Sequence, residues 1–160
     1  MGQYHLVVNL DKKEYLHPHH LGDGFKLMEF GNNACGTMTG LAILLAVSNG
    51  RGGGDLHASN LLSVQDRIGS WGGDRIAIVG DYAEDTDLDA SWEASKIFRL
   101  CLDGVYKDIS SEIRQLIEAD GMYTFTVASS GFTTRLIRSE ENEKPGTLRP
   151  DIVMYSKKNL

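Results

Sequence analysis

One apolar segment between two glycine-containing loops is the strongest constraint on the fold. Residues 41–47 read Leu-Ala-Ile-Leu-Leu-Ala-Val, with Gly36 before them and Gly50 after them. The pattern predicts a helix over 37–49, with Thr37 as its N-cap and Gly50 just past its last turn. Because the centre of this helix is apolar on nearly every side, we expect it to be buried all round. The apolar run is far too short to span a membrane.

Alternating residues at the start of the chain predict a β-hairpin. A strand is expected over 4–10, and a turn leads from it into a second strand over 14–17. Pro18 ends the second strand, because proline cannot donate to a hydrogen-bond ladder. The further strands that the pattern predicts cover residues 75–79, 122–128, 133–137 and 152–155.

The remaining helices set the fold class. A short helix is favoured over a third strand at 25–30, and Asp108 is placed to cap a helix that Asp120-Gly121 ends. Two more helices are predicted, over 61–68 and 91–102. A hairpin followed by helices and then by strands is typical of an α+β fold. We expect a mostly antiparallel sheet from the N-terminal hairpin and the C-terminal strands, packed with about three to four helices.

Length and charge limit the class of protein. A chain of 160 residues without internal repeats is expected to form a single compact domain over 1–160. It has 16 Lys+Arg and 22 Asp+Glu, a net charge of −6, which argues against an extended nucleic-acid surface. Cys35 and Cys101 do not form a disulfide framework, and the first residues lack the features of a signal peptide. We therefore expect a cytoplasmic protein with no membrane segment.

A histidine cluster is the first candidate site. His17, His19 and His20 stand together, and Asp23 follows between two glycines. Imidazole is the commonest metal ligand, and a nearby carboxylate can bind the same ion or orient a ring. These four residues are therefore candidate ligands of a divalent metal, with His5 brought near by strand pairing. The alternative is a hairpin end at which a polar segment leaves the sheet, because the spacing matches no strong zinc signature.

The loop that enters the apolar helix is the second candidate site. It resembles a phosphate-binding loop in its glycine spacing, but Thr37 stands where that motif has lysine. Free N–H groups at a helix N-terminus still favour an anion. On this interpretation a bulky residue at Gly36 would abolish ligand binding and leave the helix folded; the alternative is a tight turn. The candidate residues of this loop are Gly31, Asn32, Asn33, Gly36 and Thr37.

The loop that leaves the apolar helix is the third candidate site. Arg51 precedes three glycines at 52–54, and an arginine beside such a loop can clamp a phosphate. A mobile linker explains the glycines equally well. A helix over 37–49 spans about 18–20 Å at 1.5 Å per residue. The two loops therefore form one site only with a long ligand or with Arg51 from a second subunit.

Several short segments in the first half of the chain form a recognisable set: Gly2–Tyr4, Val8–Leu16, His17–His19, Gly22–Gly24, Trp71–Arg75 and Gly80–Tyr82. Together they resemble small proteins of phage and bacterial genomes that have no established activity. The resemblance implies no mechanism and no site residue. If the chain is encoded by a phage, the resemblance implies an accessory protein in the host cytoplasm, where it could sequester a signalling nucleotide.

Three functions remain open at this point. The first is the binding of a small anionic, nucleotide-like ligand by the glycine loops. The second is a non-enzymatic interaction protein that forms a homo-oligomer, because open sheet edges are often completed by symmetric partners. The third is a metal-dependent hydrolase that uses the histidine cluster. The sequence leaves open whether the protein is an enzyme.

Overall fold

The protein is built around a four-stranded sheet, seen here in a computed structural model that describes residues 2–57, 63–119, 123–130 and 132–137. The strand order is β3-β1-β2-β4. β1 (His5–Asn9) pairs antiparallel with β2 (Glu14–Leu16) and with β3 (Ile76–Gly80). β2 pairs in parallel with the short β4 (Lys107–Asp108). The predicted N-terminal hairpin and a strand close to 75–79 are confirmed, but β3 is an edge strand rather than a core strand, and its central residue Ile78 is exposed.

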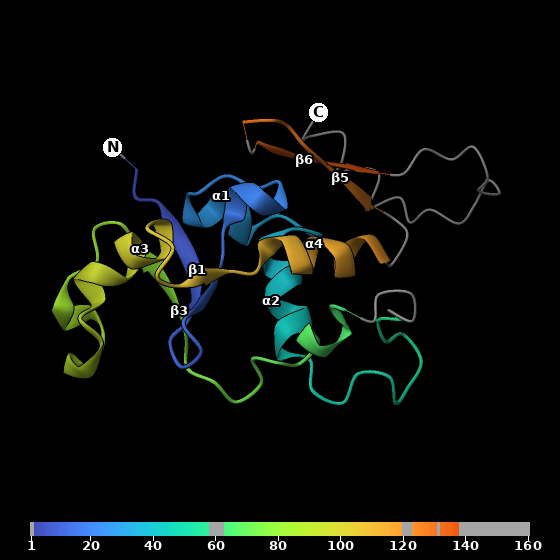
Figure 1. The fold of residues 1–160 in the computed structure, drawn as a ribbon, viewed down its shortest axis with the longest axis horizontal. Helices are drawn as coiled ribbons and strands as arrows, with labels where there is room; N and C mark the ends of the chain where they lie inside the picture. The colour runs from blue at the N-terminus through green and yellow to red at the C-terminus, as the bar shows by residue number, and fades with distance from the viewer. Residues whose placement is uncertain (1, 58–62, 120–122, 131, 138–160) are drawn as a thin grey trace.

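β1 is covered on both faces, which is why it is buried despite its alternating sequence. Val7 packs into one apolar core with helices α2 (Thr37–Leu45) and α4 (Ser110–Ala119). Leu6 and Val8 pack into a second core on the opposite face, which α3 (Ala94–Leu102) covers. Figure 1 shows the sheet between α3 on one side and α2 and α4 on the other.

The C-terminal strands form a sheet of their own. β5 (Tyr123–Val127) pairs antiparallel with β6 (Thr133–Ile137), and this hairpin lies against α4 (Figure 1). The α+β class is confirmed, but these strands do not extend the N-terminal hairpin. The positions beside β1 and β2 are already taken by β3 and β4, so the late hairpin packs elsewhere. The strand predicted over 152–155 lies outside the described residues.

α2 differs from the predicted helix in its length and in its exposure. It ends at Leu45 rather than at 49, and Ala42 and Leu45 are exposed, so only one side of the helix is buried. The helix stops because Gly69 and Trp71 donate their N–H groups to the carbonyls of Ile43 and Leu44. Gly50 therefore follows an irregular segment instead of the last helical turn.

The N-terminus of α2 also differs from the expectation. Its N-cap is Gly36, and no side chain caps the helix from that position. Thr37, predicted as the N-cap, is the first helical residue and turns its hydroxyl to the carboxylate of Asp23. At α4 the expectation is confirmed, because Asp108 Oδ1 accepts a hydrogen bond from the N–H of Ser110.

Short helices complete the fold. α1 (Leu27–Gly31) confirms a helix close to 25–30. The helix expected over 91–102 is divided at Glu93, which has a φ of 35° and separates the 3-10 turn η4 (Ala90–Trp92) from α3. The part of the expected helix 61–68 that the structure describes is a single 3-10 turn, η2 (Gln65–Arg67).

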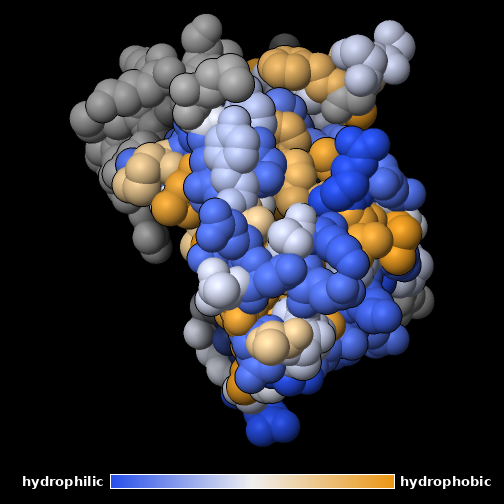
Figure 2. Space-filling model, turned by 90° about the vertical axis from the view of Figure 1, so that its left-hand side faces the viewer, coloured by the Kyte–Doolittle hydropathy of each residue, from blue (hydrophilic) through white to orange (hydrophobic). Residues whose placement is uncertain are grey.

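The surface on the α3 side of the molecule is mainly polar. In Figure 2 hydrophilic residues cover most of this face, and hydrophobic residues appear as separate islands rather than as one patch. None of the described helices combines the length and the apolar character that crossing a membrane would require.

Candidate functional site

The predicted anion position at the start of α2 is filled by a carboxylate of the chain itself. Asp23 Oδ2 accepts hydrogen bonds from the N–H of Thr37 at 2.7 Å and from its hydroxyl at 2.8 Å. Asp23 Oδ1 accepts from Asn33 Nδ2 at 3.2 Å and pairs with Arg135 Nη1 at 3.1 Å. A helix N-terminus does favour an anion here, and the anion is a side chain.

The close packing around Asp23 explains the glycine at position 36. A Cβ built at Gly36 would overlap Asp23 Oδ2 and Arg135 Nη1. Gly31 and Asn32, the other candidate residues of this loop, are exposed at the end of α1, and a Cβ at Gly31 would meet open space. The structure therefore brings three of the five predicted loop residues around Asp23: Asn33, Gly36 and Thr37.

The second glycine loop also encloses an aspartate of its own chain. Asp55 Oδ2 accepts hydrogen bonds from the N–H groups of Gly50 at 2.8 Å and Gly52 at 2.9 Å. These bonds, the one from Gly52 first, lower the pKa of Asp55 below its usual value. Asn49 closes the same loop, since its amide exchanges hydrogen bonds with the backbone of Leu56.

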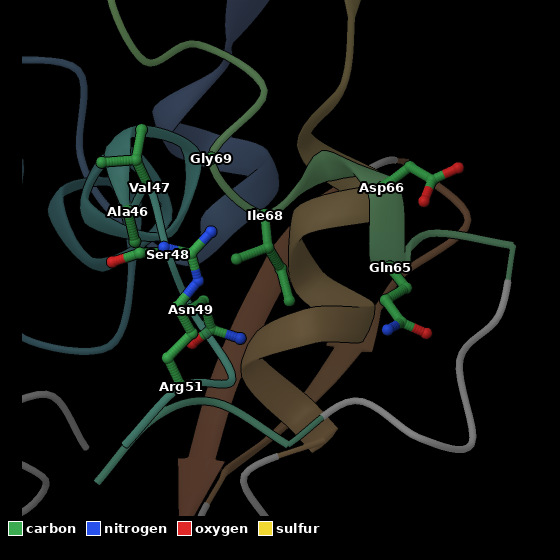
Figure 3. Close-up of a pocket in the computed structure, with 9 residues that line it drawn as sticks. All are labelled: Ala46, Val47, Ser48, Asn49, Arg51, Gln65, Asp66, Ile68 and Gly69. Carbon is green, nitrogen blue, oxygen red and sulfur yellow. The ribbon is translucent and has the colours of Figure 1, made fainter. Parts of the chain in front are cut away.

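An open pocket of about 500 Å³ lies between the C-terminal end of α2 and η2 (Figure 3). Arg51 lines it and forms no ion pair with another described side chain. In Figure 3 its guanidinium lies beside Ser48, while the carboxylate of Asp66 points away from it on the far side of Ile68. We call this the exit pocket; its lining residues are Ala46, Val47, Ser48, Asn49, Arg51, Gln65, Asp66, Ile68 and Gly69.

Contacts made by Gly69 and Arg67 fix the two walls of the exit pocket. Gly69 has a φ of 73°, and a Cβ at this position would overlap the carbonyl of Ala46, so the two walls approach closely here. Arg67, which is not one of the lining residues, binds both Glu14 and Glu112. These bonds anchor η2 to β2 and α4, and they hold the wall that carries Gln65 and Ile68.

The histidines form a separate cluster, at the start of the 3-10 turn η1 (Pro18–Leu21). The rings of His17 and His20 stack with centroids 3.9 Å apart, and Phe25 packs against His17 and His19 at 4.6 and 4.0 Å. His5 meets this group through its backbone N–H, which donates to the carbonyl of Phe25. The rings of His17, His19 and His20 therefore lie together, and His5 lies next to them, as strand pairing led us to expect.

Asp108 is the carboxylate that the structure places beside the histidines. His20 Nδ1 and Asp108 Oδ2 are 2.6 Å apart, and hydrogen bonds from His20 and Ser110 outweigh burial and lower the pKa of Asp108. Burial, reinforced by the neighbouring His20, lowers the pKa of His17 to about 4. The His17 ring is therefore neutral at pH 7, and its Nδ1 has no hydrogen-bond partner among the described residues.

The carboxylate expected to complete a metal site lies in a different environment. Asp23 Oδ1 accepts hydrogen bonds from Asn33 and Arg135, and Oδ2 accepts from Thr37, so both oxygens are already in use. When a carboxylate binds Nδ1 of an imidazole, Nε2 is the ring nitrogen left for a metal or another partner. His20 has this arrangement, because its Nδ1 is bound to Asp108. Within the described part of the chain, however, no group of three or more His, Cys, Asp or Glu side chains has an arrangement that could hold a metal ion.

Two residues have roles in the Asp23 and histidine clusters that the sequence reasoning missed. Arg135 completes the Asp23 cluster, and the sequence signal was a lone charged residue within the strand 133–137. Asp108 was identified as a helix cap, but nothing in the sequence placed it next to His20. Such pairings depend on the tertiary fold, because 112 residues separate Asp23 from Arg135 and 88 separate His20 from Asp108.

Comparison of the chain with protein-family models, with curated proteins and with solved structures found no match. The resemblance to phage and bacterial proteins stays a prediction, as does the metal-dependent hydrolase.

Proposed function

We propose that this protein binds a small anionic ligand in the exit pocket, with Arg51 as the cationic contact. The observation that carries the proposal is a guanidinium on the wall of an open cavity of about 500 Å³, without an ion-pair partner among the described side chains. The pocket is large enough for a small metabolite, since ligand pockets span roughly 300–1,000 Å³.

The two glycine loops make unequal candidates. At the entry to α2 the N–H of Thr37 is already bonded to Asp23, and the cation Arg135 is paired with the same carboxylate. In the loop that follows α2, Asp55 accepts hydrogen bonds from the N–H groups of Gly50 and Gly52, but the Arg51 side chain remains available to a ligand. An external anion would therefore meet less competition at Arg51 than at Thr37.

The composition of the exit pocket favours a ligand with an anionic group and an apolar part. Val47 and Ile68 offer apolar surface, while Ser48 and Gln65 offer neutral polar groups. A guanidinium binds phosphate or carboxylate oxygens through paired N–H groups. A nucleotide satisfies both requirements, with its phosphate at Arg51 and its base against Ile68, and it is the ligand class that we propose to test first.

Thermal unfolding in the presence of a panel of nucleotides and inorganic phosphate tests this proposal. A ligand at 100 times its dissociation constant should stabilise the protein by about 2.7 kcal/mol. Arg51→Gln should weaken binding roughly tenfold or more, because a charge-assisted hydrogen bond is lost. Arg99→Gln is the matched control, since Arg99 is 79% exposed and pairs with Asp103 outside the pocket.

Two results would count against the proposal. One is the absence of stabilisation by every anion of the panel at high concentration. The other is a ligand that binds the Arg51→Gln variant as tightly as it binds the Arg99→Gln variant and the unaltered protein.

A further inference from the structure

The main sheet has one protected edge and one unprotected edge. β4 forms one edge with only Lys107 and Asp108, and a short, charged edge strand resists pairing with another chain. β3 forms the other edge with the sequence Ile-Ala-Ile-Val-Gly, which contains neither a charge nor a proline. Its central residue, Ile78, is 41% exposed.

The register with β1 shows which backbone groups of β3 face outward. Beyond the two ends of the ladder, Asp81 N–H donates to the carbonyl of Tyr4, and Leu10 N–H donates to the carbonyl of Arg75. Hydrogen-bonded pairs alternate along an antiparallel ladder, so the odd-numbered residues of this strand turn their backbone groups toward β1. Ile76 and Ile78 turn theirs to the free edge, where no described residue bonds to them.

We infer that β3 is the contact of a symmetric homodimer, in which two copies of the strand pair antiparallel with Ile78 opposite Ile78. In this register the outward N–H and C=O groups of Ile78 meet those of the partner, and the two residues exchange both hydrogen bonds. The two-fold axis passes between them, and the two sheets join into one continuous sheet. The two exposed isoleucine side chains then lie on the same face of that sheet and cover each other.

The charges at the ends of β3 fit this register. Pairing around Ile78 places Arg75 of one copy opposite Asp81 of the other, and the two-fold axis repeats this contact. The Arg75 side chain is 65% exposed, although it pairs with Asp11 and lies 4.6 Å over the ring of Trp92. Asp81 is exposed, and within the described part of the chain its Oδ1 accepts a single bond, from the backbone N–H of Tyr4. Each group is held at the edge and accessible to a partner.

Sedimentation velocity over a wide range of protein concentrations tests the dimer. The unaltered protein should show a concentration-dependent dimer. Arg75→Asp places Asp opposite Asp81, and Asp81→Arg places Arg opposite Arg75, so each variant alone should dimerise roughly tenfold or more weakly. A mixture of the two variants should form a heterodimer, because every Asp then faces an Arg. Circular dichroism of each variant verifies that it is folded.

A second pair of variants keeps the test decisive if Arg75→Asp disturbs the fold. Ile78→Lys places two ammonium groups side by side at the two-fold axis and should abolish the dimer. Val105→Lys is the matched control, since Val105 is also an exposed aliphatic residue, at 61%, and lies outside β3. The inference is overturned by a protein that is monomeric at every concentration, by a dimer that survives Ile78→Lys, or by variants that stay monomeric when mixed.

Discussion

Asp23 and Arg135 form a buried ion pair at 3.1 Å, with side chains 0% and 7% exposed. The same guanidinium donates to the carbonyl of Leu21 at 2.9 Å, and the same carboxylate binds the start of α2 through Thr37. Three segments that are distant in the sequence therefore meet at a single carboxylate: η1 with the loop after it, α2 and β6.

Arg135→Met should destabilise the protein by about 3 kcal/mol, because removing one partner leaves the other charge buried. Asp23→Asn in the same chain should recover part of this loss, since the uncompensated charge is then absent. Chemical denaturation of the single and double variants measures the coupling. Arg99→Met, which breaks an exposed ion pair, should cost less than about 1 kcal/mol. Strictly additive effects of the Asp23 and Arg135 substitutions would contradict a direct pairing.

Gly36→Ala should lower the free energy of unfolding, an effect on stability that the sequence-based expectation for a bulky residue there, lost ligand binding with the helix still folded, did not include. The added Cβ overlaps Asp23 Oδ2 and Arg135 Nη1, so the ion pair must separate or α2 must shift. Overpacking of this kind typically costs about 1–3 kcal/mol. Gly31→Ala is the control, because a Cβ at Gly31 meets open space. Equal melting temperatures for the two variants would show that the packing around Gly36 is looser than described.

The sequence pattern predicted local structure well wherever neighbouring residues determine it. Alternation and turn residues located β1, β2 and β3, and the aspartate before α4 was correctly expected to cap it. The burial of β1 on both faces could not be read from its alternation, since it depends on α3, α2 and α4 packing from opposite sides. The early end of α2 has the same origin, because Gly69 and Trp71 supply the hydrogen bonds that terminate it.

The candidate sites show where sequence reasoning reaches its limit. Glycines and a helix N-terminus led us to expect an anionic ligand at two loops, and in the structure the N–H groups of Thr37 and Gly50 bind the chain's own carboxylates, Asp23 and Asp55. Which carboxylate reaches which N–H group depends on loop geometry that residue types do not encode. The histidines were expected near Asp23, and the fold placed Asp108 beside them instead. Arg51 is the candidate residue that lines the exit pocket.

The two cysteines should differ sharply in reactivity. Cys101 is fully buried, and burial raises the pKa of its thiol to about 12, so the reactive thiolate is scarce at neutral pH. Cys35 is partly exposed, in the loop before α2. Iodoacetamide should therefore modify Cys35 in the native protein and Cys101 only after unfolding, as peptide mass spectrometry would measure. Rapid modification of Cys101 under native conditions would contradict the packing of α3 against the sheet.

His17 should make the protein less stable as the pH falls from about 6.5 to about 4. Burial lowers the pKa of this histidine from 6.5 to about 4 in the folded state. Between these values the unfolded chain takes up a proton at His17 and the folded chain does not, so the free energy of unfolding decreases with decreasing pH. At about 1.4 kcal/mol for each pH unit, the contribution of His17 amounts to at most about 3.5 kcal/mol.

Replacing the ring with one that cannot titrate isolates this contribution. His17→Phe keeps an aromatic ring between His20 and Phe25, and it removes a buried nitrogen that lacks a hydrogen-bond partner among the described residues. Urea denaturation at a series of pH values should give a shallower slope for this variant than for the unaltered protein between pH 4 and 6.5. Carboxylates remote from this ring titrate in both proteins, so their contribution cancels in the difference. His57→Phe, at an exposed position away from this cluster, is the control for the substitution of a histidine by phenylalanine. If the slopes of all three proteins coincide, His17 is not the neutral, desolvated group that its surroundings imply.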